Sequence, residues 1–471
     1  MFLNKRYIYF IVILMMFSIL VPLDKIYAEE VLTLTEVLQA GLKENPDIKN
    51  TRLDLENARL DLSISWRNLL PEVNLQSAYT RLGEPPQVPG FQYQRVETGI
   101  PGEYPDSDIV YLYPEMIEGP QDNYTTTITL NQPLFMGGRL LLGIDQARKG
   151  VELARSVLEQ KKEDTLYQLI NTYYNTLLLS DRLQVEEEGL DLIREQKEVI
   201  RAGIEAGTIL KTDLLQVEIE ENKAWQRLQK VKNQYKLALK QLYVMSGLDK
   251  SVLKEQEVIL KKPQFKPEVN INDLSSLIKL AKENRPDLKM LSINEEMIKN
   301  NITMEKRSNW PSFMVSGNYS WQGEELKFED PEWTVTISGS LPLFQGGKSG
   351  KRLKKINNEF DKIREKKQYV SEMVEVEVTN VFNKINELEE NVVIQDQNLN
   401  KAQENLRLVN SRYKVGMVTN LDVMNARLLY RQSKLGLLQA EFNYKLAMYE
   451  LLYKTGRLGE FVEEVVNNET K

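Results

Sequence analysis

The stretch Gln132-Pro133-Leu134-Phe135-Met136-Gly137-Gly138 decides the fold, because the chain uses it twice. It returns as Leu341-Pro342-Leu343-Phe344-Gln345-Gly346-Gly347, 209 positions later (341 − 132 = 209). Gly207 and Asp213 return at the same distance as Gly416 and Asp422. A duplication this long means that one structural unit is used twice. That favours a tube, bundle or repeat architecture over a single cleft with unique catalytic residues.

A long stretch without proline follows each copy of this motif. No proline lies between Pro133 and Pro263, and none lies between Pro342 and the end of the chain, so each stretch is 129 residues long. Because proline breaks helices, these stretches predict long helices, over residues 138–204, 210–246, 347–413 and 419–455. Apolar residues recur in steps of three and four, as in Val374, Val378, Val381 and Ile385. This pattern indicates antiparallel coiled-coil hairpins about 100 Å long.

Four segments alternate between apolar and polar residues and predict strands, at 73–82, 124–132, 313–321 and 333–341. Strands of this length can cross an outer membrane when tilted. Five aromatic residues lie near strand ends, where a membrane belt would sit: Tyr79, Tyr124, Tyr319, Trp321 and Trp333. Soluble hairpins packed against the helices are the alternative.

Four strands cannot close a barrel, and open sheet edges in lipid cost several kcal/mol for each unpaired group. Other copies of the chain would therefore have to complete the sheet. A trimer with twelve strands is the smallest assembly expected to enclose open water.

The segments of the chain differ in composition. Residues 1–28 combine Lys5 and Arg6 with an apolar run and Ala28, which predicts a secretory signal peptide. A membrane anchor is the alternative, although the run is shorter than the roughly 20 residues of a spanning helix. We expect a first repeat over 29–262, a second over 263–456, and a polar tail over 457–471 that frays. The strand connection at 83–123 is long, whereas the one at 322–332 is short.

The composition excludes several kinds of chemistry. The chain has no cysteine and no histidine, so it lacks the residues of Ser-His-Asp and Cys-His catalysis and of typical zinc or copper sites. Its net charge of −7 argues against a nucleic-acid partner. Enzymes built on two carboxylates remain possible. Acidic pairs such as Glu218 and Glu220 stand in charge-rich helical stretches, however, which is typical of a solvated helix face. The sequence therefore predicts a protein that is not an enzyme and that has no catalytic residues, no cofactor and no metal site.

The signal peptide, the Asn45-Pro46-Asp47 and Arg285-Pro286-Asp287 openings, the strand pairs and the paired motifs together resemble the TolC family of outer-membrane efflux proteins. The resemblance implies a mainly α fold with a β part. In it, a homotrimer shares one transmembrane β-barrel in the cell outer membrane, and its helical hairpins form an α-barrel tunnel in the periplasm. It also implies the passive exit duct of a tripartite efflux or type I secretion system, whose partners are a periplasmic adaptor and an inner-membrane transporter.

The resemblance further assigns roles to the helical turns. The adaptor would dock on Ala206, Gly207, Thr208, Val415, Gly416 and Met417. Glycine there permits the left-handed backbone that ends a helix, and Asp213 and Asp422 are placed to cap the returning helices.

By the same resemblance, Asp213, Tyr413, Asp422 and Asn425 surround the periplasmic entrance, with Tyr413 as a hydrogen-bond partner of Asp213. The chain departs from the family pattern here. Val418 stands where the best-known member has an arginine, and Asn425 stands where it has a second acidic residue. This predicts one ring of three Asp422 carboxylates in place of two acidic rings.

Two other functions remain open from the sequence. A periplasmic coiled-coil adaptor would share the hairpins but lack a barrel, and a structural surface filament would not depend on a pump. The sequence does not specify the exported substrate, which could be a drug, a metal ion, a siderophore or a polypeptide.

Overall fold

The computed structural model describes residues 30–96, 109–248, 258–263 and 273–469, so the predicted signal peptide lies outside the described residues. The chain forms two compact units. Unit 1 comprises Met1–Leu55, Ala154–Ser292 and Glu365–Lys471, and unit 2 comprises Glu56–Leu153 and Ile293–Arg364. Each unit takes segments from both sequence repeats, so a repeat is not a compact body by itself.

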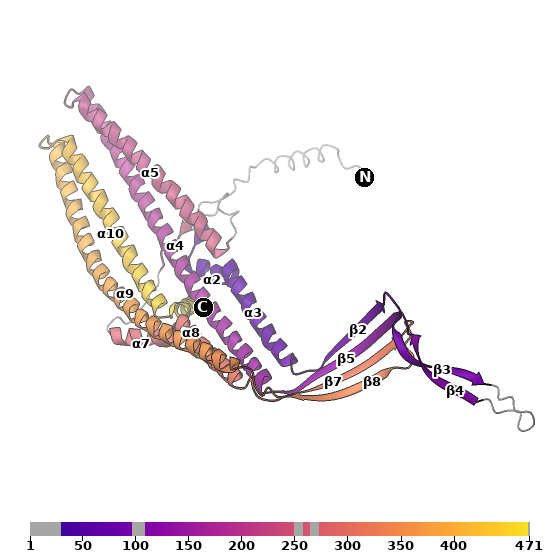
Figure 1. Ribbon diagram of the computed structural model, residues 1–471. Coiled ribbons are helices and arrows are strands. Elements are labelled where there is room, and N and C mark those ends of the chain that lie inside the picture. The colour runs from indigo at the N-terminus through magenta and orange to yellow at the C-terminus, as the bar shows by residue number, and fades with distance from the viewer. Residues whose placement is uncertain (1–29, 97–108, 249–257, 264–272, 470–471) are drawn as a thin grey trace, which may run out of the picture. The chain divides into compact units, whose positions relative to one another are not determined.

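Four long helices dominate unit 1. They are α4 (Arg139–Glu205), α5 (Lys211–Ser246), α9 (Lys348–Lys414) and α10 (Asn420–Lys454), and α4 and α9 begin in unit 2. Their bounds lie within one residue of the predicted bounds. Figure 1 shows α4 beside α5 and α9 beside α10, with both hairpins turning at the same end of the unit.

Shorter helices precede the strands in each repeat. They are α2 (Leu34–Glu44) and α3 (Pro46–Arg67) in the first repeat, and α7 (Leu274–Asn284) and α8 (Pro286–Lys306) in the second. Asn45 and Arg285 separate them, and both have a ψ near 125°. Proline disfavours the helical conformation in the residue before it but fits the first position of a helix. The two prolines therefore end one helix and begin the next.

A buried hydrophobic cluster of unit 1 joins segments far apart in the sequence. It includes Leu38, Leu169, Leu242 and Leu452. Beside it, β1 (Glu30–Leu32) pairs in parallel with β6 (Val258–Leu260). The fully buried Tyr173 donates its hydroxyl to the carbonyl oxygens of Leu32, at 3.0 Å, and Lys261, at 2.6 Å, which ties α4 to this ladder.

The prediction that the tail frays is wrong. Residues Leu458–Glu469 form helix α11, and Leu458 and Val462 are buried in the core of unit 1. Leu458, Phe461, Val462 and Val466 recur in helical steps, so the segment has one apolar face despite its acidic composition. Burial of that face stabilises the helix.

Unit 2 contains the predicted strands as one antiparallel sheet. Its order is β2 (Glu72–Arg81), β5 (Asp122–Met136), β7 (Ser312–Gly323) and β8 (Glu332–Ser340). Figure 1 shows the four strands side by side. Within the described chain, β2 and β8 each have one strand neighbour and are the edges of the sheet. The predicted fold class, long helical hairpins with a β part and an internal duplication, is confirmed.

The long connection at 83–123 contains a second hairpin that the sequence did not predict. In it, β3 (Gln87–Val96) pairs antiparallel with β4 (Ile109–Glu118). Pro89 lies within β3 and Pro114 within β4. Proline weakens the strand signal of the residues around it, so the sequence pattern favours a loop here.

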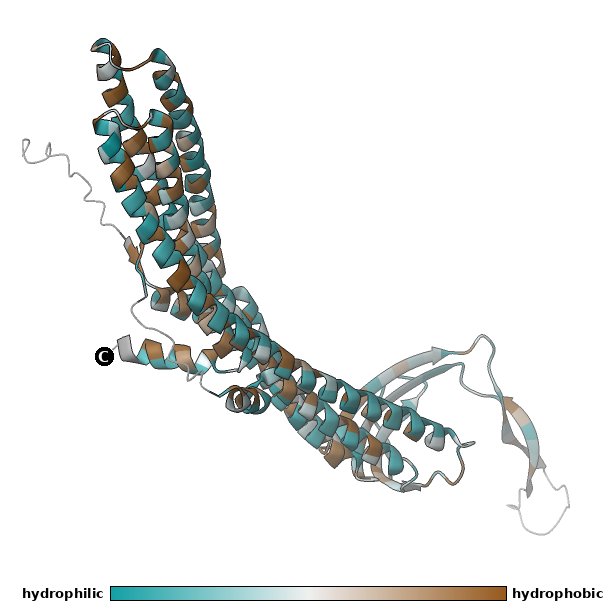
Figure 2. Ribbon diagram, turned by 90° about the vertical axis from the view of Figure 1, so that its left-hand side faces the viewer, coloured by the Kyte–Doolittle hydropathy of each residue, from teal (hydrophilic) through white to brown (hydrophobic). Residues whose placement is uncertain are grey.

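The long helices carry both hydrophilic and hydrophobic residues along their length. Figure 2 shows the two kinds interleaved on the helical hairpins. Among the described helices, none is both long enough and apolar enough to cross a membrane.

Candidate functional site

Both helical hairpins turn through a glycine in the left-handed conformation. Gly207 has a φ of 73° and Gly416 a φ of 75°. The next residue of each turn closes a loop back onto the helix: the Thr208 N–H donates to the Gly203 carbonyl at 2.9 Å, and the Met417 N–H to the Arg412 carbonyl at 3.0 Å. This is the Schellman arrangement, which satisfies carbonyls at a helix end. The predicted left-handed conformation of the two glycines is confirmed.

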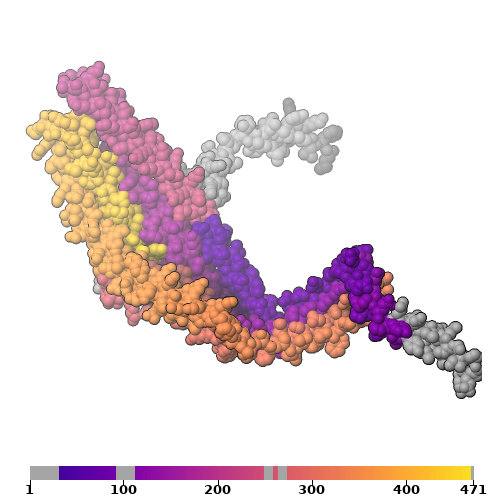
Figure 3. All heavy atoms as spheres, viewed as in Figure 1, coloured from indigo at the N-terminus to yellow at the C-terminus, as the bar shows by residue number. Residues whose placement is uncertain are grey.

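The residues of the two turns form an exposed surface, which we call the hairpin tips. It comprises Ala206, Gly207, Thr208, Val415, Gly416 and Met417, and each of them is exposed. Figure 3 shows the ends of both hairpins at the surface of unit 1. Val415 is 67% and Met417 76% exposed, and the adjoining Leu210 is 71% exposed. These exposed apolar side chains are accessible for contact with a partner.

The two aspartates near the tips differ in their local role. Thr419 is the N-cap of α10, and it forms a capping box with Asp422, whose Oδ2 accepts from the Thr419 N–H at 2.8 Å. The Thr419 hydroxyl and N–H also hold the pKa of Asp422 below its usual value. In α5 the N-cap is Leu210 and no side chain caps it, so the prediction that Asp213 caps this helix is wrong.

Tyr413 connects the two hairpins near the tips. Burial raises its pKa, and the negative charge of Asp213 on α5 raises it further. The polar side chain of Gln196 on α4 acts in the opposite direction and lowers the pKa of Tyr413. The structure therefore brings Tyr413 and Asp213 close enough to interact electrostatically. Asn425 is exposed, one turn beyond Asp422 on α10.

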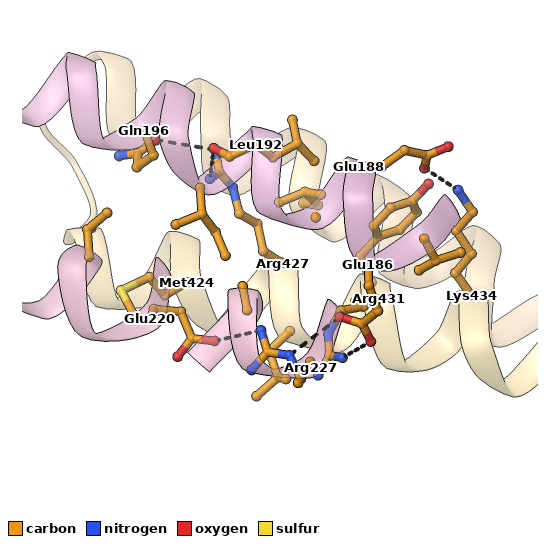
Figure 4. Close-up of a pocket in the computed structure, with 18 residues that line it drawn as sticks. Glu186, Glu188, Leu192, Gln196, Glu220, Arg227, Met424, Arg427, Arg431 and Lys434 are labelled. Carbon is orange, nitrogen blue, oxygen red and sulfur yellow. Dashed lines mark hydrogen bonds and ion pairs between the residues drawn. The ribbon is translucent and has the colours of Figure 1, made fainter. Parts of the chain in front are cut away.

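The sequence did not reveal a buried charge cluster between the hairpins. Figure 4 shows it beside a cavity of about 80 Å³ lined by α4, α5, α9 and α10. Glu186 of α4 is 5% exposed and lies between two arginines. Its Oε1 accepts from Arg431 of α10 at 2.7 Å, and its Oε2 lies 3.4 Å from Nε of Arg227 of α5. Arg227 also binds Glu220 at 3.0 Å.

Further polar links join α4 to α10 along the same side. Arg427 donates to the Leu192 carbonyl at 2.7 Å, and Lys434 pairs with Glu188 at 2.6 Å. Desolvation lowers the pKa of Arg427. Together with the Glu186 cluster, these contacts hold the second hairpin against the first.

A sequence signal for this cluster does exist. Arg427, Arg431 and Lys434 recur in steps of four and three, so they share one face of α10. Such a stripe of charges is typical of a solvent-exposed helix face. It indicates a buried cluster only when the packing of the opposing helix is known. Glu186 stands in the acidic run Glu186-Glu187-Glu188, which gives no indication that only the first of the three is buried.

The predicted belt aromatics gather at one end of the β2-β5-β7-β8 sheet. Tyr79 faces Tyr124, and Tyr319 faces Trp333, in directly paired positions. The Tyr79 and Tyr124 rings lie 4.8 Å apart, and those of Tyr319 and Trp321 lie 4.9 Å apart. Directly paired residues share a face, so all five aromatics lie on one face of the sheet.

Apolar side chains continue this face toward the other end of the sheet. Val73, Leu75, Ile128, Leu130, Val335 and Ile337 occupy it. At the far end, Phe135 faces Phe313. Tyr319 lies six positions after Phe313 on β7, which is about 20 Å along a strand. The face thus has an apolar middle between two aromatic ends, as the outer face of a membrane barrel has.

The structure gathers no metal-ligating set in the part of the chain that it describes. Across those residues, no three Asp or Glu side chains come together in a way that could hold an ion.

Comparisons with known proteins agree with this architecture. The family model described as "Outer membrane efflux protein" matches residues 37–248 and 277–457. The outer membrane efflux protein BepC of Brucella suis is 23% identical, over 72% of this chain and 74% of its own length. The outer membrane protein TolC of Escherichia coli is 21% identical, over 92% of this chain and 84% of its own length.

A solved structure shows the same fold. The outer membrane channel CmeC of Campylobacter jejuni superimposes with a TM-score of 0.71 at 15% identity, covering 93% of this chain and 89% of its own.

Proposed function

Because the chain belongs to the family of outer membrane efflux proteins, we propose that three copies form the exit channel of a tripartite efflux or type I secretion system. The channel lies in the cell outer membrane, and the helical hairpins extend into the periplasm. It is passive, and a pump in the inner membrane supplies the energy. The four-stranded sheet, with its apolar face and two open edges, is the observation that carries this proposal.

The sheet supports a membrane-spanning, oligomeric state. Trp333, Val335 and Ile337 on β8 are 71%, 62% and 73% exposed in the single chain. Lipid would cover such side chains, while a neighbouring copy would pair the backbone groups at the edges of the sheet. Three copies bring twelve strands together, which is enough for a water-filled interior. A soluble coiled-coil adaptor has no need for this face.

The hairpin tips are the proposed docking surface for a periplasmic adaptor. Their exposed apolar residues, Val415, Met417 and Leu210, provide the contact area, and the glycines let a partner approach the backbone closely. The Gln196 and Tyr413 contacts and the Glu186 cluster hold the hairpins together at rest. We propose that adaptor binding shifts this packing and opens the entrance.

Three Asp422 carboxylates, one from each copy, form the proposed acidic ring at the entrance, with Asp213, Tyr413 and Asn425 nearby. The lowered pKa of Asp422 supports this role, because the carboxylate stays ionised at periplasmic pH. A ring of negative charge favours the passage of cations.

Single-channel recording in planar bilayers tests both parts of the proposal. We expect unitary currents with cation selectivity in the parent protein. Asp422→Asn should lower the selectivity, and Glu283→Gln, an exposed carboxylate on α7, should leave it unchanged. Unchanged selectivity in Asp422→Asn would refute the acidic ring but not the channel. A complete absence of unitary currents from all three proteins would refute the channel.

A further inference from the structure

The cavity between the two hairpins has a mostly apolar wall. All four long helices contribute to it, and its apolar residues include Ile193, Val217, Ala224, Leu406, Met424 and Leu428. Val217 and Ala224 of α5 are each 1% exposed, so this part of the wall is closed to solvent. Binding sites for small organic molecules are concave and mostly apolar, with a few polar groups that fix the orientation of the ligand. The polar groups of this cavity therefore indicate what it can hold.

The charged groups around the cavity do not balance. Four cations line it, Arg227, Arg427, Arg431 and Lys434, but only three carboxylates, Glu186, Glu188 and Glu220, so the lining carries a net charge of +1 (4 − 3 = 1). Three of the cations pair with these carboxylates. The fourth is Arg427. Among the residues that the structure describes, no carboxylate lies within ion-pair distance of it, and its hydrogen bonds go to neutral groups.

Arg427 keeps hydrogen-bonding capacity for a ligand. Its guanidinium donates to two neutral acceptors on α4, the Leu192 carbonyl at 2.7 Å and the Gln196 amide oxygen at 3.3 Å (Figure 4). A guanidinium has more N–H donors than these two bonds use. Gln196 is 8% exposed, and its amide nitrogen reaches the side chain of Asn420 only at 3.4 Å. A carboxylate is a stronger acceptor for arginine than an amide oxygen, because charge assists the hydrogen bond.

We infer that the cavity is a binding site for a small amphiphilic organic anion, a carboxylate attached to an apolar body. The carboxylate accepts from Arg427 and supplies the missing negative charge. The apolar body lies against Val217, Met424 and Leu428. A neutral apolar molecule would leave the charge of Arg427 uncompensated, and an inorganic anion would leave the apolar wall uncovered.

The size of the cavity links binding to the separation of the hairpins. Its volume is about 80 Å³, whereas a protein cavity that binds benzene has a volume of about 150 Å³. A ring of this size therefore has to widen the cavity. Because α4 and α5 form one hairpin and α9 and α10 form the other, widening moves the two hairpins apart, and the ligand stabilises the more open packing. The binding site is independent of the proposed channel, but this effect on the entrance rests on it.

Benzoate is a suitable probe, because it joins a carboxylate to a benzene ring. Benzamide is its matched control, since it has nearly the same shape without the charge. Saturation-transfer NMR of the full-length protein in phospholipid nanodiscs measures the binding of either molecule, and empty nanodiscs give the background from lipid. The comparison of benzoate with benzamide uses the parent protein alone, so it does not depend on the folding of any variant.

The first variant removes the cation. Arg427→Gln takes away the positive charge and keeps a polar side chain. Its matched control is Arg407→Gln, which changes an exposed arginine of α9 that pairs with Glu404 of the same helix at 2.7 Å.

The second variant fills the cavity and keeps the cation. Gly189 of α4 lines the cavity, and a Cβ added to it would meet its nearest neighbour, Cδ of Arg431, at 4.0 Å. Gly189→Val therefore places a side chain at the cavity without a backbone clash. Its matched control is Gly150→Val, in the same helix and with open space around it.

We expect benzoate to bind the parent protein and the two control variants equally. Binding should be weaker by about tenfold or more for benzamide, for Arg427→Gln and for Gly189→Val, because the charge pair or the room for the ring is then lost. No binding of benzoate to the parent above the empty nanodiscs, or undiminished binding to Arg427→Gln or Gly189→Val, would overturn the site. Equal binding of benzamide and benzoate would overturn the assignment of an anion.

Recording in planar bilayers tests the link to the entrance. Benzoate on the side of the hairpin tips should raise the open fraction of the channel in the parent protein but not in Gly189→Val. Binding of benzoate without a change in the open fraction would overturn the widening of the cavity and leave the site standing. Absence of unitary currents while benzoate still binds would refute the proposed channel and not the site.

Discussion

Neutralising Glu186 should loosen the two hairpins from each other far more than neutralising its neighbour Glu188. Both carboxylates lie on α4 and pair with α10, so they form a matched pair of sites. Glu186 is buried between Arg431 and Arg227, whereas the side chain of Glu188 is 47% exposed and pairs with Lys434 at the surface. The variants Glu186→Gln and Glu188→Gln therefore compare a buried with an exposed charge while preserving shape.

The magnitude follows from these contacts. At about 4 Å between charge centres and an effective dielectric constant of about 20, each arginine attracts Glu186 by about 4 kcal/mol, or about 8 kcal/mol together. Desolvation of the ions offsets much of this attraction. Removing one partner of a buried pair nevertheless costs about 3–5 kcal/mol, because the other charges are left unpaired. The side chains of Arg431 and Arg227 are 20% and 30% exposed, so we expect the lower end of this range. Glutamine keeps one acceptor oxygen, so we expect a loss of about 3 kcal/mol, against less than about 1 kcal/mol for the exposed pair.

Hydrogen exchange of the α10 amides near Arg431 measures this difference. A loss of about 3 kcal/mol in opening free energy raises exchange rates more than about a hundredfold, because about 1.4 kcal/mol is a factor of ten. Glu188→Gln should raise them by less than about fivefold. Equal effects of the two variants, or an effect of Glu186→Gln below about fivefold, would refute the argument that the buried cluster holds the hairpins together.

Two further predictions concern the turn glycine and a buried carboxylate. Gly416→Ala should destabilise its hairpin by about 1–2 kcal/mol, because φ at this position is 75°. Gly150→Ala, inside α4 with open space around it, should stabilise the protein slightly. Thermal unfolding in detergent should show shifts of the unfolding temperature with opposite signs, and shifts of the same sign would contradict the assigned turn geometry. Burial raises the pKa of Glu163 to about 7, so its contribution to stability is complete below pH 4.5 and is lost as the pH rises through 7. Glu163→Gln should therefore stabilise the protein by about 1–3 kcal/mol at pH 8 but hardly at pH 4.5. A gain in stability that is independent of pH, or an equal gain in the exposed Glu464→Gln, would contradict this assignment.

Long-range regularities of the sequence predicted most of the fold. The bounds of the four long helices came from proline spacing and helical periodicity, because both signals are summed over dozens of residues. The four strands of the main sheet were found for the same reason. Helix α11 was missed because its acidic residues conceal four apolar ones, Leu458, Phe461, Val462 and Val466, whose burial depends on contacts with distant helices.

The candidate site was only partly predictable. Gly207 and Gly416 were predicted correctly because a left-handed turn requires a residue without a side chain. The Glu186 cluster was not, because no local pattern distinguishes a buried glutamate from its exposed neighbours. The relation between Tyr413, Gln196 and Asp213 depends on how two hairpins pack, which lies beyond any single helix.

Native mass measurement of the protein extracted from outer membranes tests the central claim most directly, because the account requires neighbouring copies to complete the sheet. We predict a mass of three chains, obtained only after extraction with detergent. A single chain that is stable in aqueous buffer without detergent would contradict the account.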